Sequence, residues 1–175
     1  LHVSTDGGVT WTPRGPTADW LRVVSSADGD VLAALENQGR IHFSFDSGET
    51  WQPRSETLPW HGLAMSADGT RLVATTSFQE PVRVSSDAGL TWTLRGPHLF
   101  WKSALAGSAD GRLLVASAPI SLVHSDDFGE TWTERTGLPF ETTVSLASSA
   151  DGSVLAAGAV GGLFTSYDGG ATWAR

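Results

Sequence analysis

The sequence of 175 residues contains no cysteine, one tyrosine, one methionine and only 11 Lys and Arg residues against 19 Asp and Glu. Without cysteine there is no disulfide, no thiol nucleophile and no Cys-ligated zinc. Cysteine content therefore does not indicate whether the protein works in an oxidising or a reducing compartment. A net charge of −8 leaves too little basic surface to neutralise phosphates, so we expect no nucleic-acid partner. The uncharged run at residues 154–164 is too short for a transmembrane segment, which needs about 18 apolar residues, so we expect no membrane insertion.

A pattern of eight residues, S-x-D-x-G-x-T-W, occurs five times along the chain, with its aspartates spaced by 40, 41, 40 and 41 residues. Its Asp and Trp residues are Asp6 and Trp11, Asp46 and Trp51, Asp87 and Trp92, Asp127 and Trp132, and Asp168 and Trp173. A second motif, S-A-D-G, alternates with the first and contains Asp28, Asp68, Asp110 and Asp151. The arginines that follow the box tryptophans, Arg14, Arg54, Arg95 and Arg135, keep the same period. One unit of about forty residues is therefore repeated along the chain.

Each unit contains short segments of strand composition separated by turn residues, and none has a helical period. In the unit from Trp20 to Arg54 the expected strands are residues 21–25, 31–35, 40–45 and 50–54. Four-stranded antiparallel units in a row predict an all-β fold, a β-propeller with Asp-box turns and about four and a half blades. An open stack of sheets is the alternative.

The expected single propeller segment, residues 1–175, begins with a half blade at residues 1–15. Its four-stranded blades are residues 17–55, 57–96, 98–136 and 139–175. Half a blade cannot close a ring, and the sequence starts at Leu1 with no signal-like stretch. We therefore expect a fragment of a longer protein or a homo-oligomer formed through open blade edges.

Both motifs have a structural explanation that needs no ligand. In the first motif, the aspartate is expected to accept backbone N–H groups two or three residues on, and the glycine to take a positive φ. The tryptophan would fill the space between successive sheets. S-A-D-G is interpreted as a two-residue hairpin turn between the first and second strands. All nine of these aspartates are predicted to be structural.

At these motifs the sequence resembles the Asp-box (BNR) repeat family of β-propellers along essentially the whole chain. The family includes sialidases, sortilin-type propellers, xyloglucan-cleaving endoglucanases and photosystem II assembly and stability factors. The pairing of S-A-D-G with S-x-D-x-G-x-T-W is most similar to the last group and to bacterial propellers like it. In the family the Asp box is a folding motif, so the resemblance implies a fold and leaves function open. Many members are exported, which favours an extracellular or periplasmic location.

Catalysis within this segment is not expected. A sialidase of this family would have an arginine cluster and a tyrosine nucleophile paired with a glutamate, whereas the one tyrosine, Tyr167, occupies a variable position of the last Asp box. Glycoside hydrolysis needs two carboxylates roughly 5 to 10 Å apart, and spacing in a sequence cannot establish such a pair. No loop has calcium-motif spacing and the five histidines are scattered, so neither a metal nor a cofactor is expected.

A candidate binding rim follows from the blade connections and the loops between second and third strands, which share the end of the blades opposite the two motifs. Its residues are Trp20, Arg22, Trp60, His61, Phe78, Glu80, Trp101, Lys102 and Glu141. Aromatic residues beside polar ones can stack on a sugar or hold a peptide loop. The alternative is that the three tryptophans pack against the neighbouring blade.

The leading hypothesis is a non-catalytic scaffold for protein–protein interaction or assembly that binds through Trp20, Trp60 and Trp101. The alternative is a carbohydrate-binding propeller or a fragment of an Asp-box glycoside hydrolase of sialidase or endoglucanase type. In that case Glu80 or Glu141 would be candidate catalytic carboxylates. The expected partner is therefore a protein or a glycan.

Overall fold

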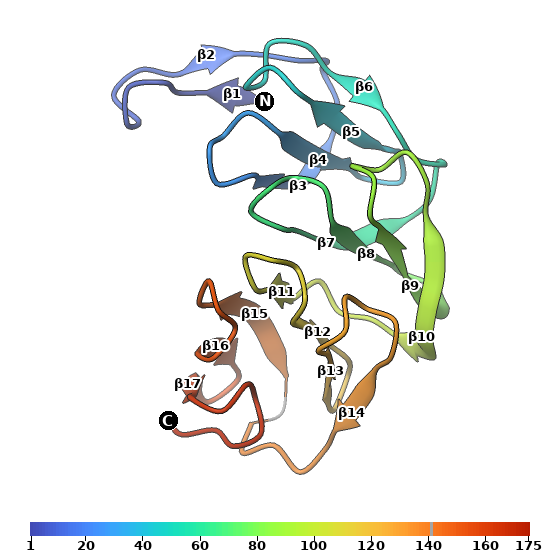
Figure 1. Cartoon of the computed structure of the whole chain (residues 1–175), viewed down its shortest axis with the longest axis vertical. Helices are drawn as coiled ribbons and strands as arrows, with labels where there is room; N and C mark the ends of the chain where they lie inside the picture. The colour runs from blue at the N-terminus through green and yellow to red at the C-terminus, as the bar shows by residue number, and fades with distance from the viewer. Residues whose placement is uncertain (141) are drawn as a thin grey trace.

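The computed structural model describes residues 1–140 and 142–175, and shows five antiparallel sheets that follow one another in an arc from the N-terminus to the C-terminus (Figure 1). The described residues contain strands and no helix. The all-β prediction and the partial propeller of about four blades are confirmed. Glu141 lies outside the described residues, so its predicted place on the rim remains a prediction.

Each blade is a meander in which strands pair in chain order. The half blade contains β1 (His2–Val3) and β2 (Thr12–Pro13). Blade 1 contains β3 (Trp20–Ser25), β4 (Leu32–Glu36), β5 (Ile41–Ser44) and β6 (Gln52–Pro53). Blade 2 contains β7 (Trp60–Met65), β8 (Leu72–Thr76), β9 (Gln79–Ser85) and β10 (Thr93–Phe100). Blade 3 contains β11 (Leu105–Gly107), β12 (Leu114–Ser117), β13 (Leu122–Ser125) and β14 (Thr133–Arg135). Blade 4 contains β15 (Thr143–Ser148), β16 (Leu155–Ala159) and β17 (Gly162–Ser166), with a single bridge from Thr165 to Ala174 at the place of its fourth strand.

Hydrophobic cores lie between consecutive blades. The second strands are the most apolar because both of their faces are covered, as in β4, where Ala33, Ala34 and Leu35 are fully buried. The first strands β3, β7, β11 and β15 contact one another in sequence along the inner side of the arc. One apolar cluster joins blades 1 and 2, a second joins blades 2 and 3, and a third joins blades 3 and 4. Each blade is thus stabilised mainly by its neighbours.

The Asp-box turn is held by its own serine, aspartate and threonine. In the second box, Asp46 Oδ1 accepts the backbone N–H of Thr50, four residues on, at 2.8 Å, and the Ser44 hydroxyl accepts the N–H of Gly48. The predicted reach of two or three residues is met in the first box, where Asp6 accepts the N–H of Val9 at 3.0 Å, but the bond that all five boxes share is to the threonine four residues on. Gly48 has a φ of 92° as predicted, and Ser47 before it has a φ of 55°.

S-A-D-G forms a longer turn than predicted. Ser26 N–H donates to Val31 O, so this bond encloses four residues and the two-residue hairpin prediction was wrong. The extra length lets the alanine of each motif bond to the next blade: Ala27 N–H donates to Ala67 O at 2.8 Å, Ala67 to Ala109 at 2.6 Å, and Ala109 to Ala150 at 2.7 Å. A chain of backbone bonds thus links all four blades at one end.

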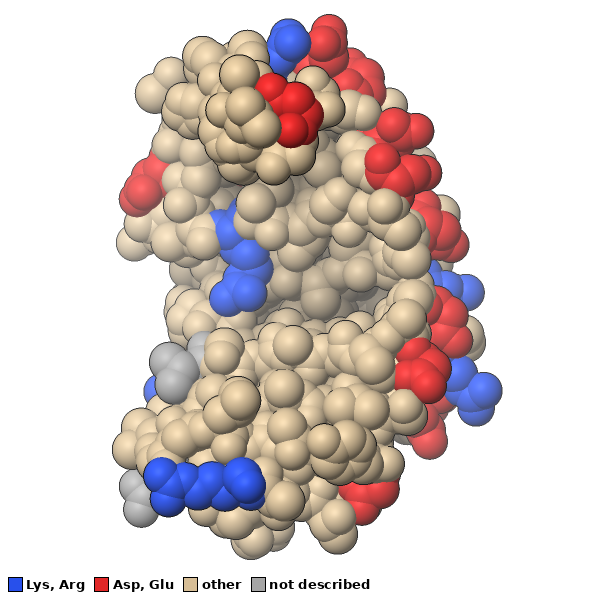
Figure 2. Space-filling view, turned by 90° about the vertical axis from the view of Figure 1, so that its left-hand side faces the viewer, with Lys and Arg blue, Asp and Glu red and all other residues tan. Residues whose placement is uncertain are grey.

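The two motifs share that end of the blades, as predicted. Ser47 N–H, in the Asp box, donates to Asp30 O beside the S-A-D-G turn of the same blade at 3.1 Å, and Phe128 N–H donates likewise to Arg112 O. We call this end the Asp rim, and the opposite end, with the blade connections and the loops between second and third strands, the loop rim. Figure 2 shows a row of Asp and Glu side chains along the right-hand edge of the molecule, with fewer elsewhere on this face.

Blade 2 has the longest outer strands. Strand β10 runs to Phe100, past the blade boundary expected at residue 96 and into residues assigned to the third blade. Its pairing with β9 shifts between Arg95 and Leu99 and then resumes at Leu99 and Phe100. Gly96, with a φ of 83°, and Pro97 lie in this irregular stretch. The bulge lets the strand resume pairing at the loop rim.

Candidate functional site

The three tryptophans predicted to form the binding rim are partners of the Asp-box tryptophans. Trp60 and Trp101 are each only 3% exposed. The ring of Trp60 lies 5.8 Å from that of Trp92, and the ring of Trp101 lies 6.0 Å from that of Trp132. Trp20 pairs in the same way with Trp51, and Phe140 pairs with Trp173. Each of the four blades therefore contains one aromatic pair, and the pairs of blades 2, 3 and 4 belong to the cores between blades.

Hydrogen bonds hold the two buried indoles in place. Trp101 Nε1 donates to Glu80 O at 2.6 Å, and Trp60 Nε1 donates to Glu56 O at 3.3 Å. Their rings are not open surfaces on which a ligand could stack. Trp20 is half-buried, and its Nε1 has no acceptor among the described residues.

The other predicted rim residues do not form one cluster. Phe78 is 53% exposed, and Lys102 is also exposed. His61 is half-buried, with Nδ1 lying 3.2 Å from Trp101 O, and Arg22 is half-buried on β3. Whether this rim binds a partner stays a prediction.

Glu80, near the start of β9, is engaged by residues of its own blade. Its Oε1 accepts the Thr76 hydroxyl at 2.7 Å and lies 3.4 Å from Arg83 Nη2. Arg83 in turn lies 5.9 Å from the centre of the Trp60 ring. The carboxylate therefore links the end of β8 to Arg83 on β9.

Most of the described carboxylates have partners of their own. All nine motif aspartates accept the hydroxyl of the serine two residues before them. Seven others bind a neighbour: Asp19 binds Asn37, Asp30 binds Ser47, Glu36 binds His42, Glu49 binds Arg14, Glu80 binds Thr76, Glu130 binds Arg95 and Glu134 binds Ser121. Of the described side chains, this leaves Glu56 in the connection to blade 2 and Asp126 in the Asp box of blade 3. These two residues lie at opposite rims.

The Asp-rim aspartates are strong acids because they accept several hydrogen bonds. The pKa of Asp46 falls from 3.8 to about 2, first through the Thr50 hydroxyl and then through the Thr50 N–H and the Ser44 hydroxyl. The same three contacts lower the pKa of Asp127 and Asp168 to about 2. The Asp rim is therefore negatively charged at neutral pH.

A groove of about 570 Å³ opens between blades 1 and 2. It is bordered by the end of β6 and the connection to blade 2 on one side, and by β9 and the Asp box of blade 2 on the other. Its lining residues are Arg40, Pro53, Arg54, Ser55, Glu56, Leu58, Trp60, Arg83, Gly89, Leu90 and Trp92. Three of the 11 basic residues of the chain thus line one groove, beside a single carboxylate.

Two groove residues differ from their counterparts in neighbouring blades. Arg14 is paired with Glu49 at 3.1 Å and Arg95 with Glu130 at 3.1 Å, in both cases across to the Asp box of the next blade. At the corresponding box position opposite Arg54 stands Leu90. Arg83 occupies the repeat position of His42 in blade 1. The groove was not predicted because the periodic arginines were treated as equivalent, although the box residue opposite them varies along the chain as Glu49, Leu90, Glu130 and Ala171.

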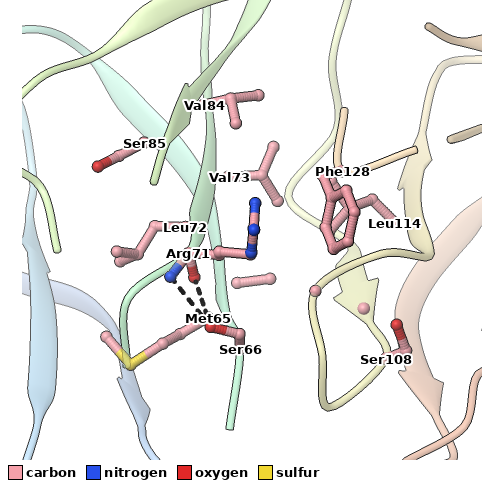
Figure 3. A pocket seen from close by; sticks show the side chains of 13 residues that line it. Met65, Ser66, Arg71, Leu72, Val73, Val84, Ser85, Ser108, Leu114 and Phe128 are labelled. Atoms are coloured by element: carbon pink, nitrogen blue, oxygen red, sulfur yellow. Dashed lines mark hydrogen bonds between the residues drawn. The ribbon is translucent and has the colours of Figure 1, made fainter. Parts of the chain in front are cut away.

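The Asp-rim end of the junction between blades 2 and 3 is closed. Arg71 reaches across from blade 2 and lies 4.0 Å over the ring of Phe128, as the close view in Figure 3 shows. The cavity that these two side chains line with Ser66 and Ser108 holds only about 10 Å³, the space of one water molecule. Phe128 has a φ of 64°, a strained value for a bulky residue.

Two further properties concern the described residues alone. They contain no group of three or more His, Asp or Glu side chains that could hold a metal ion. They also contain no helix with the length and hydropathy that a membrane crossing requires.

Comparison with known proteins agrees with this geometry. Residues 2–13 and 123–134 match the family described as BNR/Asp-box repeat. The chain contains Asp-box repeats. The resemblance to the Asp-box (BNR) repeat family that the motifs indicate is thereby confirmed. No curated protein sequence matches it.

Three solved structures illustrate which propellers this chain is similar to. A GH74 enzyme of Niastella koreensis is 18% identical, with a TM-score of 0.71, and the match covers 93% of this chain and 25% of the enzyme. YCF48 bound to D1 peptide is 22% identical, with a TM-score of 0.69, and the match covers 97% of this chain and 58% of YCF48. The WD40 repeats of RRP9 are 14% identical, with a TM-score of 0.67, and the match covers 87% of this chain and 49% of that one.

The likeness at these identities concerns the fold alone. The Asp-box propeller spans about a quarter of the GH74 enzyme and just over half of YCF48. Enzymes and non-enzymatic propellers are both among the similar structures, so function has to be argued from the side chains of this chain.

Proposed function

We propose that this chain is a non-catalytic β-propeller scaffold that binds a protein partner. The observation that supports the proposal is that most described carboxylates already have a hydrogen-bond or ion-pair partner within the chain. Glycoside hydrolysis uses two carboxylates that face each other across the scissile bond. Of the described carboxylates, only Glu56 and Asp126 lack a partner, and they lie at opposite rims.

Two comparisons agree with a binding role. YCF48, which this chain resembles in fold, is described in complex with D1 peptide. WD40 repeats share the fold as well. A rigid ring of blades presents loops and grooves for binding without chemistry of its own.

The first test is turnover. The chain is incubated with xyloglucan and with chromogenic glycosides, and we expect no release of product. Turnover that Glu80→Gln abolishes would overturn the scaffold proposal and favour a glycoside hydrolase. Thr76→Val is the matched control, because it removes the hydroxyl bound to Glu80 and leaves the carboxylate in place.

The second test separates a protein partner from a glycan. Displayed peptides are selected on the immobilised chain, and soluble oligosaccharides are titrated while tryptophan fluorescence is followed. We expect selected peptides that bind in solution, and no fluorescence change with the sugars. A saturable response to a sugar, with no peptide selected, would support the carbohydrate-binding alternative.

A further inference from the structure

We propose that the groove between blades 1 and 2 docks an extended acidic segment of a protein partner, one that alternates carboxylate and apolar side chains. This inference rests on the scaffold function proposed above. It goes further by naming the surface and the chemistry of the partner.

First, Arg54 lacks the glutamate that its equivalents at the two neighbouring junctions have. Arg14 and Arg95 each form a salt bridge to the next Asp box, while Arg54 faces Leu90. Its Nη1 donates to Ala88 O at 3.1 Å, and the guanidinium lies 4.2 Å over the ring of Phe45. A guanidinium has five N–H donors, so most of its capacity is available to a carboxylate.

Second, two more arginines line the same groove. Arg40 is exposed and donates from Nε to the Thr57 hydroxyl at 3.3 Å. Arg83 is held by Glu80, and its Nε is buried with no acceptor among the described residues. Among the described residues, neither Arg40 nor Arg54 has an ion-pair partner. A basic groove on a chain with a net charge of −8 favours an acidic occupant.

Third, the groove also has apolar walls. The half-buried Trp92 lines it, and Leu90, 66% exposed, stands at its edge with Pro53. An exposed leucine and proline give an apolar side chain of a ligand something to bury against. The volume of about 570 Å³ suits a few side chains of a peptide.

Fourth, the surroundings disfavour a nucleic acid in the same groove. A phosphate backbone needs a continuous basic surface, whereas the adjoining Asp rim consists of ionised aspartates. A short acidic peptide fits between those charges because it covers little more than the groove itself. The mixture of arginines and apolar side chains therefore favours a peptide.

The experiment uses a fluorescein-labelled peptide of alternating Glu and Leu, followed by fluorescence anisotropy with the 175-residue chain. A peptide of alternating Lys and Leu is the charge control. We expect the acidic peptide to bind, more weakly as salt is raised, and the basic one not to bind. Arg54→Ala is expected to weaken binding roughly tenfold, the typical effect of losing one charge-assisted hydrogen bond.

Two variants make the test specific. Leu90→Glu introduces the glutamate that the boxes on either side have as Glu49 and Glu130, so it is expected to pair with Arg54 and weaken binding by roughly tenfold or more without loss of thermal stability. Arg95→Ala removes the equivalent arginine of the next junction and is expected to leave the affinity unchanged. Thermal melting of each variant checks that the fold is intact.

The outcomes separate the two proposals. If the acidic peptide binds but neither Arg54→Ala nor Leu90→Glu weakens it, the groove is the wrong surface and the scaffold proposal stands. If the acidic peptide does not bind while peptides selected on the chain do, the groove inference is again overturned alone. If no peptide binds at all, both proposals are overturned.

Discussion

Two junctions of the propeller, between blades 1 and 2 and between blades 2 and 3, share their buried aromatic pair. They differ in the box residue that faces the arginine of the preceding blade. Both have an aromatic pair in the core, Trp60 with Trp92 in the first and Trp101 with Trp132 in the second. At the second junction a salt bridge of 3.1 Å spans the blades, whereas at the first a leucine replaces the glutamate and a groove opens.

The difference shows that the positions that stabilise a junction are not the positions that distinguish one junction from another. Burial of a large aromatic side chain contributes several times more than an exposed salt bridge. The salt bridge can therefore be lost at one junction without loosening the blades. Substitutions at the two junctions are therefore expected to change the free energy of unfolding most where they remove buried groups.

The largest effect is expected from removing an aromatic partner at either junction. Trp60→Ala and Trp101→Ala should each lower the free energy of unfolding by about 3–5 kcal/mol, because each ring is buried in an interblade core. Urea unfolding followed by circular dichroism measures the loss. Trp11→Ala, at a position 61% exposed, is the control and should cost far less. A loss at Trp60 no larger than at Trp11 would mean that the first junction is not packed as described.

A smaller loss is expected from Gly89→Ala. Gly89 has a φ of 81°, and an added Cβ would collide with the ring of Phe43 across the first junction. Strain and overpacking together should cost about 2–4 kcal/mol in urea unfolding. Gly7→Ala is the matched control, because Gly7 has a similar φ and open space around it, and about 1 kcal/mol is expected there. Equal losses at the two glycines would show that the blades are not in close contact at Gly89.

The sequence predicted the fold because its information is periodic. Each Asp box contains a serine, aspartate and threonine that bond to one another, so a short stretch determines its own turn and five copies determine an arc. The burial of Trp60 and Trp101 could also be expected from their period, which matches that of the box tryptophans. Their selection as a binding rim overlooked this match.

The groove could not be predicted in the same way. Its lining comes from a connection, a strand and a turn that lie up to 52 residues apart, from Arg40 to Trp92. No local rule brings them together. The helpful signal was Leu90, which stands where the boxes on either side have Glu49 and Glu130. That difference becomes informative only once the residue opposite it is known to be Arg54.

Acid is expected to act on both junctions alike, because each has the same Asp-rim turns. At the first junction, partial burial acts to raise the pKa of Asp87, but hydrogen bonds from Thr91 and Ser85 outweigh it and lower the pKa. At the second junction, the corresponding hydrogen bonds lower the pKa of Asp127 from 3.8 to about 2. The contribution of both groups is therefore present above their ordinary pKa of 3.8 and is lost as the pH falls through the lowered values. The contribution of these carboxylates to the free energy of unfolding, measured by urea titration, should be constant from pH 7 to about 5 and should decline below about pH 4. A decline that Asp127→Asn removes entirely would assign the effect to one junction and contradict the shared origin.

The smallest effect concerns the salt bridge that distinguishes the junctions. Both side chains are largely exposed, 37% for Arg95 and 61% for Glu130, so a double-mutant cycle with alanine should give a coupling of about 0.2–1 kcal/mol. The same cycle on Arg54 and Leu90 should give a coupling near zero, and repeating it with Glu at position 90 should bring the coupling up to that of the second junction. Raising the salt concentration should reduce both ionic couplings and leave the Arg54 and Leu90 value unchanged. A large coupling between Arg54 and Leu90 in the natural chain would mean that the groove is closed by contact between these two side chains, and the contrast between the junctions would then disappear.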